Sequence, residues 1–187
     1  MSIAMMEWLS ELRTAMDREF GDRSRVMILA TVDRSGGPQA RCVVCRRVTE
    51  DGRLFFASDS RTKKNDQVRG EKRAAIVCWM PAIRVQFRIN GDVKIVGYPE
   101  DESLRKEIWQ GLTDESRSLS FWPTPGIAAA SDDAFARAVG SDVPPPQNFE
   151  ILIMEPKQVI RLALDSHPHR RRLWRAEANW AGVDVNP

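Results

Sequence analysis

The chain has 187 residues, of which 42% are hydrophobic and 29% are charged, a composition typical of one globular domain and not of a disordered chain. The 28 basic and 26 acidic residues leave a net charge of +2, which by itself points to neither nucleic acid nor an anionic membrane as a partner. No run is long and apolar enough to span a membrane, and the N-terminus carries acidic residues too early for a signal peptide. We therefore expect a cytoplasmic protein with a single domain over residues 1–187.

Hydrophobic periodicity predicts a β-rich chain that begins with a helix. Apolar residues recur at helical spacing over residues 5–20, which predicts an N-terminal helix within residues 1–22. Strands are predicted, in chain order, over residues 26–32, 39–48, 54–58, 74–80 and 83–96. The first three are joined by short turns, which indicates antiparallel pairing. Asn90 and Gly91 form either a hairpin turn or a bulge within one long strand.

The remaining segments predict helices around a barrel. Residues 61–69 are polar and are expected to form a loop that enters a short helix. Residues 97–147 interrupt the strands as a helical and loop insertion, with a helix over 99–112 and one short helix in the Pro- and Asp-rich part. Strands resume over residues 149–154, 159–164 and 173–176. The pattern predicts an α+β fold dominated by an antiparallel barrel with peripheral helices.

The strand Arg41–Arg46 contains two arginines and two cysteines. Side chains alternate along a strand, so Arg41 and Arg46 leave opposite faces, and so do Cys42 and Cys45. This geometry disfavours a disulfide or a shared metal, and we expect Cys42 and Cys45 to be buried and unpaired. Two exposed arginines on a solvated strand remain the simplest interpretation of the segment taken alone.

Residues 56–64 combine features that suit a phosphate group. A strand ends, small hydroxylated residues follow, and Lys63 and Lys64 stand where a helix begins. Backbone N–H groups at a helix start, a hydroxyl group and lysine charges together form a phosphate cradle. Any basic loop shares part of this pattern, so the segment is not diagnostic alone.

The C-terminal segment 167–175 is basic and contains both histidines of the chain. His167 and His169 could share a strand face, but a metal site would need a third ligand from a distant residue, and we predict none. Basic residues beside Trp174 leave nucleic-acid binding open as a non-enzymatic alternative.

In this order and spacing, the segments resemble the pyridoxamine 5′-phosphate oxidase-like family of FMN-binding split barrels. The matching pieces are Ile28–Val32, Gly37–Arg41, Arg41–Arg46, Leu54–Lys64, Gln86–Gly91 and His169–Arg171. The resemblance runs through residues 26–86, is loose over 97–147 and returns from 149 to 187. It implies an antiparallel six-stranded split barrel, the cofactor FMN, and a homodimer with FMN at the interface.

The resemblance also implies residues that contact the cofactor. Its phosphate would be held by Arg41, Thr62, Lys63 and Lys64. The isoalloxazine ring would lie beside Cys42, Val43 and Val44, with Arg46 near its polar edge. The remaining implied flavin contacts are Ala57, Ser58, Gln86 and Arg171.

Three departures from the oxidases bear on the substrate. Arg46 stands where they have lysine, Leu162 where they have tryptophan, and His167 where they have the arginine of an Arg-x-His element. The resemblance thus implies an FMN-dependent oxidoreductase with an altered substrate site, in which His169 and Arg171 orient a small-molecule substrate. The alternatives are a relative that uses a deazaflavin, a non-catalytic flavin carrier or sensor, and a nucleic-acid-binding module, which the low net charge disfavours.

Overall fold

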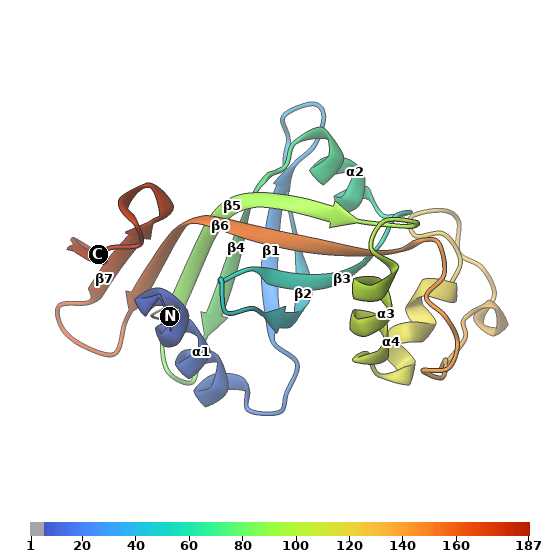
Figure 1. Ribbon diagram of the computed structural model, residues 1–187, viewed down its shortest axis with the longest axis horizontal. Coiled ribbons are helices and arrows are strands. Elements are labelled where there is room, and N and C mark those ends of the chain that lie inside the picture. The colour runs from blue at the N-terminus through green and yellow to red at the C-terminus, as the bar shows by residue number, and fades with distance from the viewer. Residues whose placement is uncertain (1–5) are drawn as a thin grey trace.

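A computed structural model describes residues 6–187 (Figure 1). The helices are α1 (Glu7–Phe20), α2 (Lys63–Gly70), α3 (Glu102–Gln110) and α4 (Asp114–Ser118). The strands are β1 (Val26–Val32), β2 (Pro38–Val48), β3 (Leu54–Asp59), β4 (Arg73–Met80), β5 (Val85–Val96), β6 (Phe149–Ala163), β7 (Arg170–Arg175) and β8 (Val183–Val185). Among these residues, no helix has both the length and the apolar character needed to cross a membrane.

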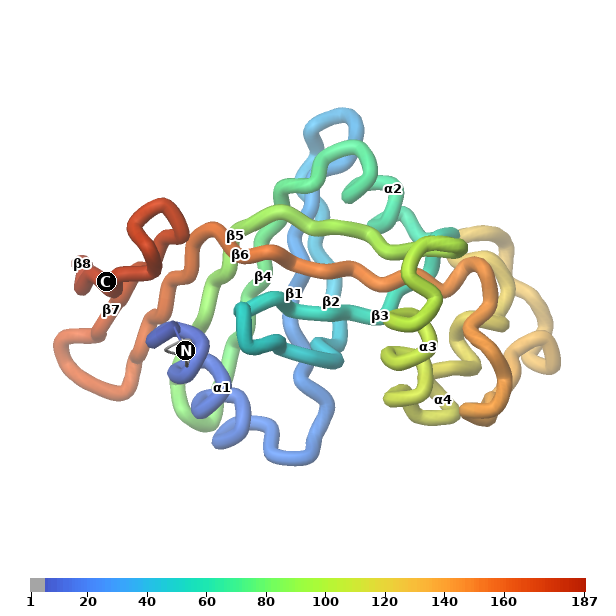
Figure 2. The backbone as a smooth tube through the Cα atoms, in the orientation of Figure 1, coloured from blue at the N-terminus to red at the C-terminus, as the bar shows by residue number. Residues whose placement is uncertain are grey.

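The strands form one antiparallel sheet that closes on itself. The strand order is β3-β2-β1-β4-β5-β6-β7-β8, and β3 pairs back onto β6, so β1 to β6 form the six-stranded barrel. The first part of β6 pairs with β3, whereas its last part pairs with β7 outside the closed barrel. Strand β6 runs beside β5 across the molecule, from the end near α3 to the end near β7 (Figure 2). The predicted split barrel is confirmed.

Strand β6 corrects the expectation of two separate strands over 149–154 and 159–164. The chain stays extended between them because β5 pairs with both parts, and a bulge between Asn90 and Gly91 accommodates the change of register beside Pro156. Asn90 and Gly91 therefore form a bulge in one long strand and not a hairpin turn. Strand β8 and helix α4 were not predicted, because both are too short to carry a periodic signal.

Two apolar clusters hold the fold together. The barrel interior is covered at one end by α1, whose Trp8, Leu9 and Leu12 are fully buried. A second cluster lies outside the barrel, where Phe55, Ile151 and Ile153 of β3 and β6 pack against α3 through Ile108 and Trp109. This second cluster fixes α3 and α4 next to the end of β3. The predicted short helix in the insertion is reduced to a single 3₁₀ turn at Asp132–Ala134.

The chain ends are joined by a polar contact between α1 and β7. Trp174 Nε1 donates to Glu7 Oε2 over 2.9 Å, and Arg172 pairs with the same carboxylate at 3.0 Å. The hydrogen bond from Trp174 and the charge of Arg172 lower the pKa of Glu7. Burial raises it, but the two lowering effects outweigh burial, and the pKa lies below its ordinary value. The terminal strands are thereby fastened to the N-terminal helix.

The cysteines differ in exposure. Cys45 and Cys78 are buried, and burial raises the pKa of each thiol to about 12. Cys42 is exposed on the outer face of the barrel, which corrects the expectation that it is buried like Cys45. The strand alternation that separates Cys42 from Cys45 also places Cys42 outside, since Val43 and Cys45 face the core.

Candidate functional site

A cavity of about 430 Å³ opens where β3 ends and α2 begins. Its polar side is formed by Ser58, Asp59, Thr62 and Lys64, and β2 contributes Arg46. The opposite side comes from α4 and the irregular segment that follows it, including Trp122 and Phe135. The volume is within the range of small-molecule sites.

The start of α2 is arranged to receive an anion. Thr62 is the N-cap residue, but its side chain does not cap the helix, so the first backbone N–H groups have no side-chain acceptor. The Thr62 hydroxyl donates to Asp59 O over 2.7 Å and accepts from Lys64 Nζ over 2.9 Å. Burial lowers the pKa of Lys64, with Arg41 adding to the shift and Asp59 and Glu150 opposing it. An incoming anion would compensate this half-buried ammonium group.

A buried network behind Thr62 fixes the first turn of α2. Ser58 Oγ donates to Asn65 Oδ1 over 2.6 Å, and Asn65 Nδ2 donates to Glu150. Arg69 pairs with the same Glu150 carboxylate. Ser58, Asn65 and Glu150 are all buried, so the network ties α2 rigidly to β3 and β6.

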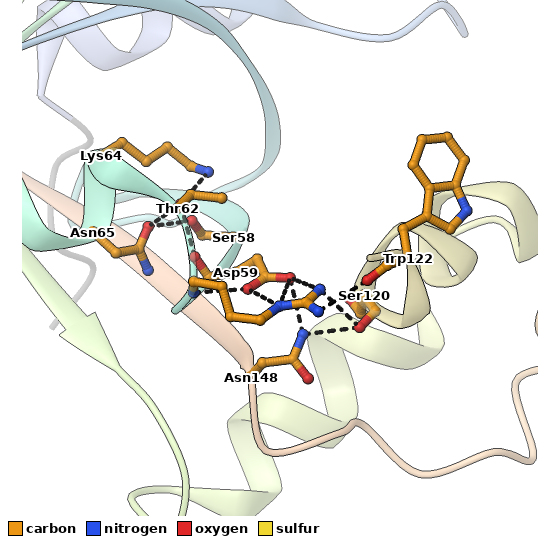
Figure 3. Close-up of polar contacts among 9 residues, drawn as sticks. Ser58, Asp59, Thr62, Lys64, Asn65, Ser120, Trp122 and Asn148 are labelled. Atoms are coloured by element: carbon orange, nitrogen blue, oxygen red, sulfur yellow. Dashed lines mark hydrogen bonds and ion pairs between the residues drawn. The ribbon is translucent and has the colours of Figure 1, made fainter. Parts of the chain in front are cut away.

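A second network links the polar side of the cavity to the segment that forms its opposite side (Figure 3). The Arg61 guanidinium donates to Asp59 Oδ1 over 2.9 Å and to Trp122 O over 2.9 Å. Asn148 Nδ2 bridges Asp59 Oδ2 and Ser120 O at 2.9 and 2.8 Å. Burial alone would raise the pKa of Asp59, but the bonds from Arg61 and Asn148 outweigh it and lower the pKa.

Arg41 lies at the end of the barrel beneath α2 and does not line the cavity. Its Nη1 donates to Thr31 Oγ1 over 2.7 Å and its Nη2 to Gln67 Oε1 over 2.6 Å. The guanidinium is nevertheless near enough to Lys64 for its charge to lower that lysine's pKa. Arg41 thus adds positive charge to the start of α2 from the barrel side.

The other predicted residues of β2, β3 and α2 are divided between different faces of the molecule. Ala57 lines the cavity beside Ser58. Lys63 is exposed and lines a different hollow with Asp66. On β2, Val43 is buried in the barrel core, while Cys42 and Val44 face outward. The structure therefore brings Arg46, Ala57, Ser58, Thr62 and Lys64 together and leaves Lys63 and Val43 apart.

Gln86 and Arg171 lie at the other end of the molecule. Both are paired with Leu162, so the three form one cross-strand row on β5, β6 and β7. In Figure 1, β7 lies at the far left, away from α2, which lies at the top near the centre. Arg171 Nε is buried and has no hydrogen-bond partner among the described residues. His169 is exposed just before β7, with Nδ1 2.9 Å from Ser166 O.

Trp122 lines the cavity, and Arg61 and Asn148 belong to the network beside it, but none of the three was among the predicted site residues. The sequence signal for Arg61 is its position two residues after Asp59, whose Oδ1 also accepts from the Arg61 backbone N–H over 2.8 Å. Asn148 joins the network, and Trp122 reaches the cavity, only through the tertiary fold.

The chain was compared with known protein families and with curated proteins, and both comparisons found matches in one family. Residues 5–97 match the family described as "Pyridoxamine 5'-phosphate oxidase, FMN-binding domain". A curated relative, the pyridoxine/pyridoxamine 5′-phosphate oxidase of Agrobacterium fabrum, is 33% identical over 97 residues, which are 52% of this chain and 45% of that protein. The chain therefore spans about half the length of the curated relatives it matches.

Two solved structures resemble the whole fold. A pyridoxamine 5′-phosphate oxidase-related, FMN-binding protein from Nostoc punctiforme is 31% identical, with a TM-score of 0.89 and full coverage of both chains. PhzG from Burkholderia lata, solved with tetrahydrophenazine-1-carboxylic acid, is 20% identical with a TM-score of 0.76, covering 96% of this chain and 89% of that one. The second likeness shows the fold alone.

The residues at the cavity fit FMN. Lys64, the Thr62 hydroxyl and the uncapped N–H groups of α2 suit a phosphate. Arg46, which lines the cavity, has a buried Nε donor without a partner among residues 6–187, as expected for a group that meets a polar ligand. On these grounds and on the full-length match, the chain belongs to the pyridoxamine 5′-phosphate oxidase-like family of FMN-binding split-barrel proteins.

Proposed function

We propose that the protein is an FMN-dependent oxidoreductase acting on a small molecule. The observation that carries the proposal is the convergence of Arg46, Ala57, Ser58, Thr62 and Lys64 on one cavity at the start of α2. Bound FMN supplies two-electron redox chemistry, and the protein supplies anchoring, orientation and a shaped cleft.

The proposed roles follow from charge and position. Thr62 and Lys64 hold the phosphate, with Lys63 at its outer side and Arg41 adding charge from the barrel end. Cys42, Val43 and Val44 form the strand that supports the ring, and Arg46 lies at its polar edge. Gln86 and Arg171 complete the flavin site, and His169 and Arg171 orient the substrate. His169 is exposed just before β7, so a substrate can reach its side chain.

A homodimer explains why these residues lie at opposite ends of one chain. A second copy would bring Gln86 and Arg171 of one protomer to the Lys64 end of its partner. The outer face of the barrel supports this arrangement, since Ile28 and Trp79 are 41% and 43% exposed there. Exposed apolar side chains gathered on one sheet face are typical of an interface.

We expect Trp79→Arg to separate the protomers, because it places a charge within this apolar face. Sedimentation velocity should show a dimer for the unaltered chain and a monomer for the variant. Cys42 supplies a second measurement: a thiol reagent should label it faster in the variant, while Cys45 and Cys78 stay unlabelled in both. A Trp79→Arg protein that remains dimeric would exclude this face as the interface.

The first experiment is the visible absorption spectrum of the purified protein, with mass analysis of any released chromophore. A flavin spectrum with release of FMN supports the proposal, and turnover is then tested with pyridoxamine 5′-phosphate and other candidate substrates. A protein that is colourless and does not bind added FMN contradicts it. FMN binding without steady-state oxidation of any candidate would favour a flavin carrier or sensor.

A further inference from the structure

One side of the cavity beside α2 is formed by a loop whose two ends meet. Trp122 Nε1 donates to Ala136 O over 2.7 Å, and the Trp122 ring packs edge-on against Phe135 with ring centroids 5.2 Å apart. Residues 123–130, between these ends, line the cavity. A surface loop with joined ends is an Ω-loop, a class of loop that frequently carries function.

The body of this loop has few ties to the rest of the molecule. Every residue from 124 to 134 is exposed, and Ile127, at 64%, is the most exposed large apolar side chain among the described residues. Within residues 6–187, no hydrogen bond joins residues 123–135 to another part of the chain. Because it has few buried contacts, the loop can move away from the cavity at a small cost in free energy once its ends are released.

Arg61 holds the first end of the loop. Its Nη1 donates to Trp122 O over 2.9 Å and its Nη2 donates to Ser120 O over 3.2 Å, so both arms of the guanidinium are used. Arg61 also pairs with Asp59 at 2.6 Å, and the two side chains are only 27% and 14% exposed. A charged pair that is sheltered from water and bonded through several atoms keeps its geometry better than an exposed pair. The Arg61 guanidinium is therefore held in place where it meets the loop.

Asp59 connects this contact to the proposed phosphate site (Figure 3). Its backbone oxygen accepts from the Thr62 hydroxyl over 2.7 Å, and the same hydroxyl accepts from Lys64 Nζ. Its carboxylate accepts from Arg61 and from Asn148. Asp59 thus lies between the residues suited to an anion and the residue that holds the loop. One series of hydrogen bonds therefore joins the start of α2 to the loop over the cavity.

We propose that Arg61 is a positioning residue that holds residues 122–136 closed as a lid over the cavity and thereby slows the exchange of bound FMN. Arg61 is not among the residues that line the cavity, so it acts on the ligand through the loop. A loop closed over a cofactor excludes water and shapes the surface that a substrate meets. The inference rests on the proposed function, because FMN is the ligand whose exchange it describes.

The first test measures the association and the dissociation of FMN separately, by stopped-flow flavin fluorescence. A residue that only holds the lid hinders the passage of FMN in both directions. We expect Arg61→Gln to raise both rate constants about tenfold, the effect of one hydrogen bond from a charged donor, and to change the equilibrium affinity less than about threefold. Loss of a direct contact with FMN would instead weaken the affinity through faster dissociation, with no faster association.

Two further variants separate the lid from the ion pair. Arg61→Lys keeps a positive charge beside Asp59 but replaces the two arms of the guanidinium by one ammonium group. Its rate constants should lie between those of Arg61→Gln and those of the unaltered chain. Arg53→Gln is the matched control, because Arg53 also pairs with an aspartate two residues earlier, Asp51, but precedes β3 and is remote from the cavity. It should leave both rate constants unchanged.

A thiol on the wall of the cavity reports lid opening without FMN. Ser120 is 8% exposed and lines the cavity, so the thiol introduced by Ser120→Cys should react slowly with a thiol reagent. Adding Arg61→Gln should speed this reaction about tenfold. Cys42, which is exposed on the outer face of the barrel, is the internal reference, and its reaction rate should be the same with and without Arg61→Gln. Mass analysis of the labelled peptides distinguishes the two thiols.

The outcomes separate this inference from the function on which it rests. Faster exchange of FMN together with faster labelling supports the lid. If FMN binds and Arg61→Gln weakens its affinity without faster association, or changes neither the exchange nor the labelling, the inference is overturned and the flavoprotein proposal stands. If the protein binds no FMN, the proposed function fails, and the labelling rates alone decide the inference. If Arg61→Gln does not fold, the comparison of Arg61→Lys with Arg53→Gln decides it.

Discussion

Replacing Lys64 by glutamine is expected to weaken FMN binding about 10- to 150-fold, the cost of about 1.5 to 3 kcal/mol for losing a hydrogen bond to a charged group. Lys64 lines the cavity, and its ammonium group contacts the Thr62 hydroxyl. Quenching of FMN fluorescence during titration measures the affinity. Riboflavin, which lacks the phosphate, serves as the control ligand, and its affinity should change less than about threefold.

The matched control variant is Lys94→Gln, an exposed lysine paired with Glu100 and remote from the cavity. It should bind FMN as the unaltered chain does. If Lys64→Gln weakens riboflavin as much as FMN, the lysine does not contact the phosphate.

The same lysine gives FMN binding a pH dependence. Because burial lowers the pKa of Lys64, the free protein loses this charge at a lower pH than an ordinary lysine would. The affinity for FMN should therefore fall as the pH rises through that lowered pKa, and the fall should be absent in Lys64→Gln. Titrations of both proteins across the alkaline range check the difference. Parallel declines in the two proteins would assign the effect to another group.

Replacing Gly91 by alanine is expected to destabilise the fold by about 3 kcal/mol, lowering the melting temperature by about 6 to 12 °C. A Cβ at Gly91 would lie 2.0 Å from the backbone oxygen of Glu155 and 3.0 Å from Met154 Sδ. Neither strand can move easily, because Gly91 forms the bulge opposite Pro156 in the middle of the β5–β6 pairing. Calorimetry or circular dichroism measures the transition.

Gly111→Ala is the control variant, because it also replaces a glycine by alanine but creates no steric clash. Its Cβ would meet Ile108 O at 3.5 Å, an ordinary contact, and its φ of −76° suits alanine. The variant should therefore be neutral or slightly more stable. A melting temperature for Gly91→Ala within about 2 °C of the unaltered chain would show that the bulge can relax.

Sequence patterns predicted the barrel well because its strands alternate and its turns are short. The segments 26–32 and 74–80 correspond closely to β1 and β4. The division of β6 was wrong because Glu155 and Lys157, both exposed, interrupt the apolar pattern without interrupting the backbone pairing. The local polarity of these residues thus suggested that a strand ends there, but pairing with β5 keeps the backbone extended.

The candidate site was predictable only where it is local in sequence. Ser58, Thr62 and Lys64 follow one another at a strand-to-helix junction, so residue type marked the segment as suited to a phosphate and the family resemblance assigned the individual contacts. The residues that hold them, Glu150 and Asn148, come from a distant segment and are defined by contacts in three dimensions. The separation of Gln86 and Arg171 from this junction also depends on the closed barrel.

The pairing of β3 with β6 has a consequence for synthesis of the chain. The register joins Leu54 to Met154, so the barrel cannot close until the ribosome has delivered the residues of β6. Until then a nascent β1–β5 sheet has two open edges, at β3 and at β5, whose N–H and C=O groups are unpaired. Such edges recruit other strands, and Phe55 of β3, which later packs outside the barrel, stays uncovered for the same interval. The nascent protein is thus most exposed to aggregation, and most in need of a chaperone, just before its sixth strand arrives.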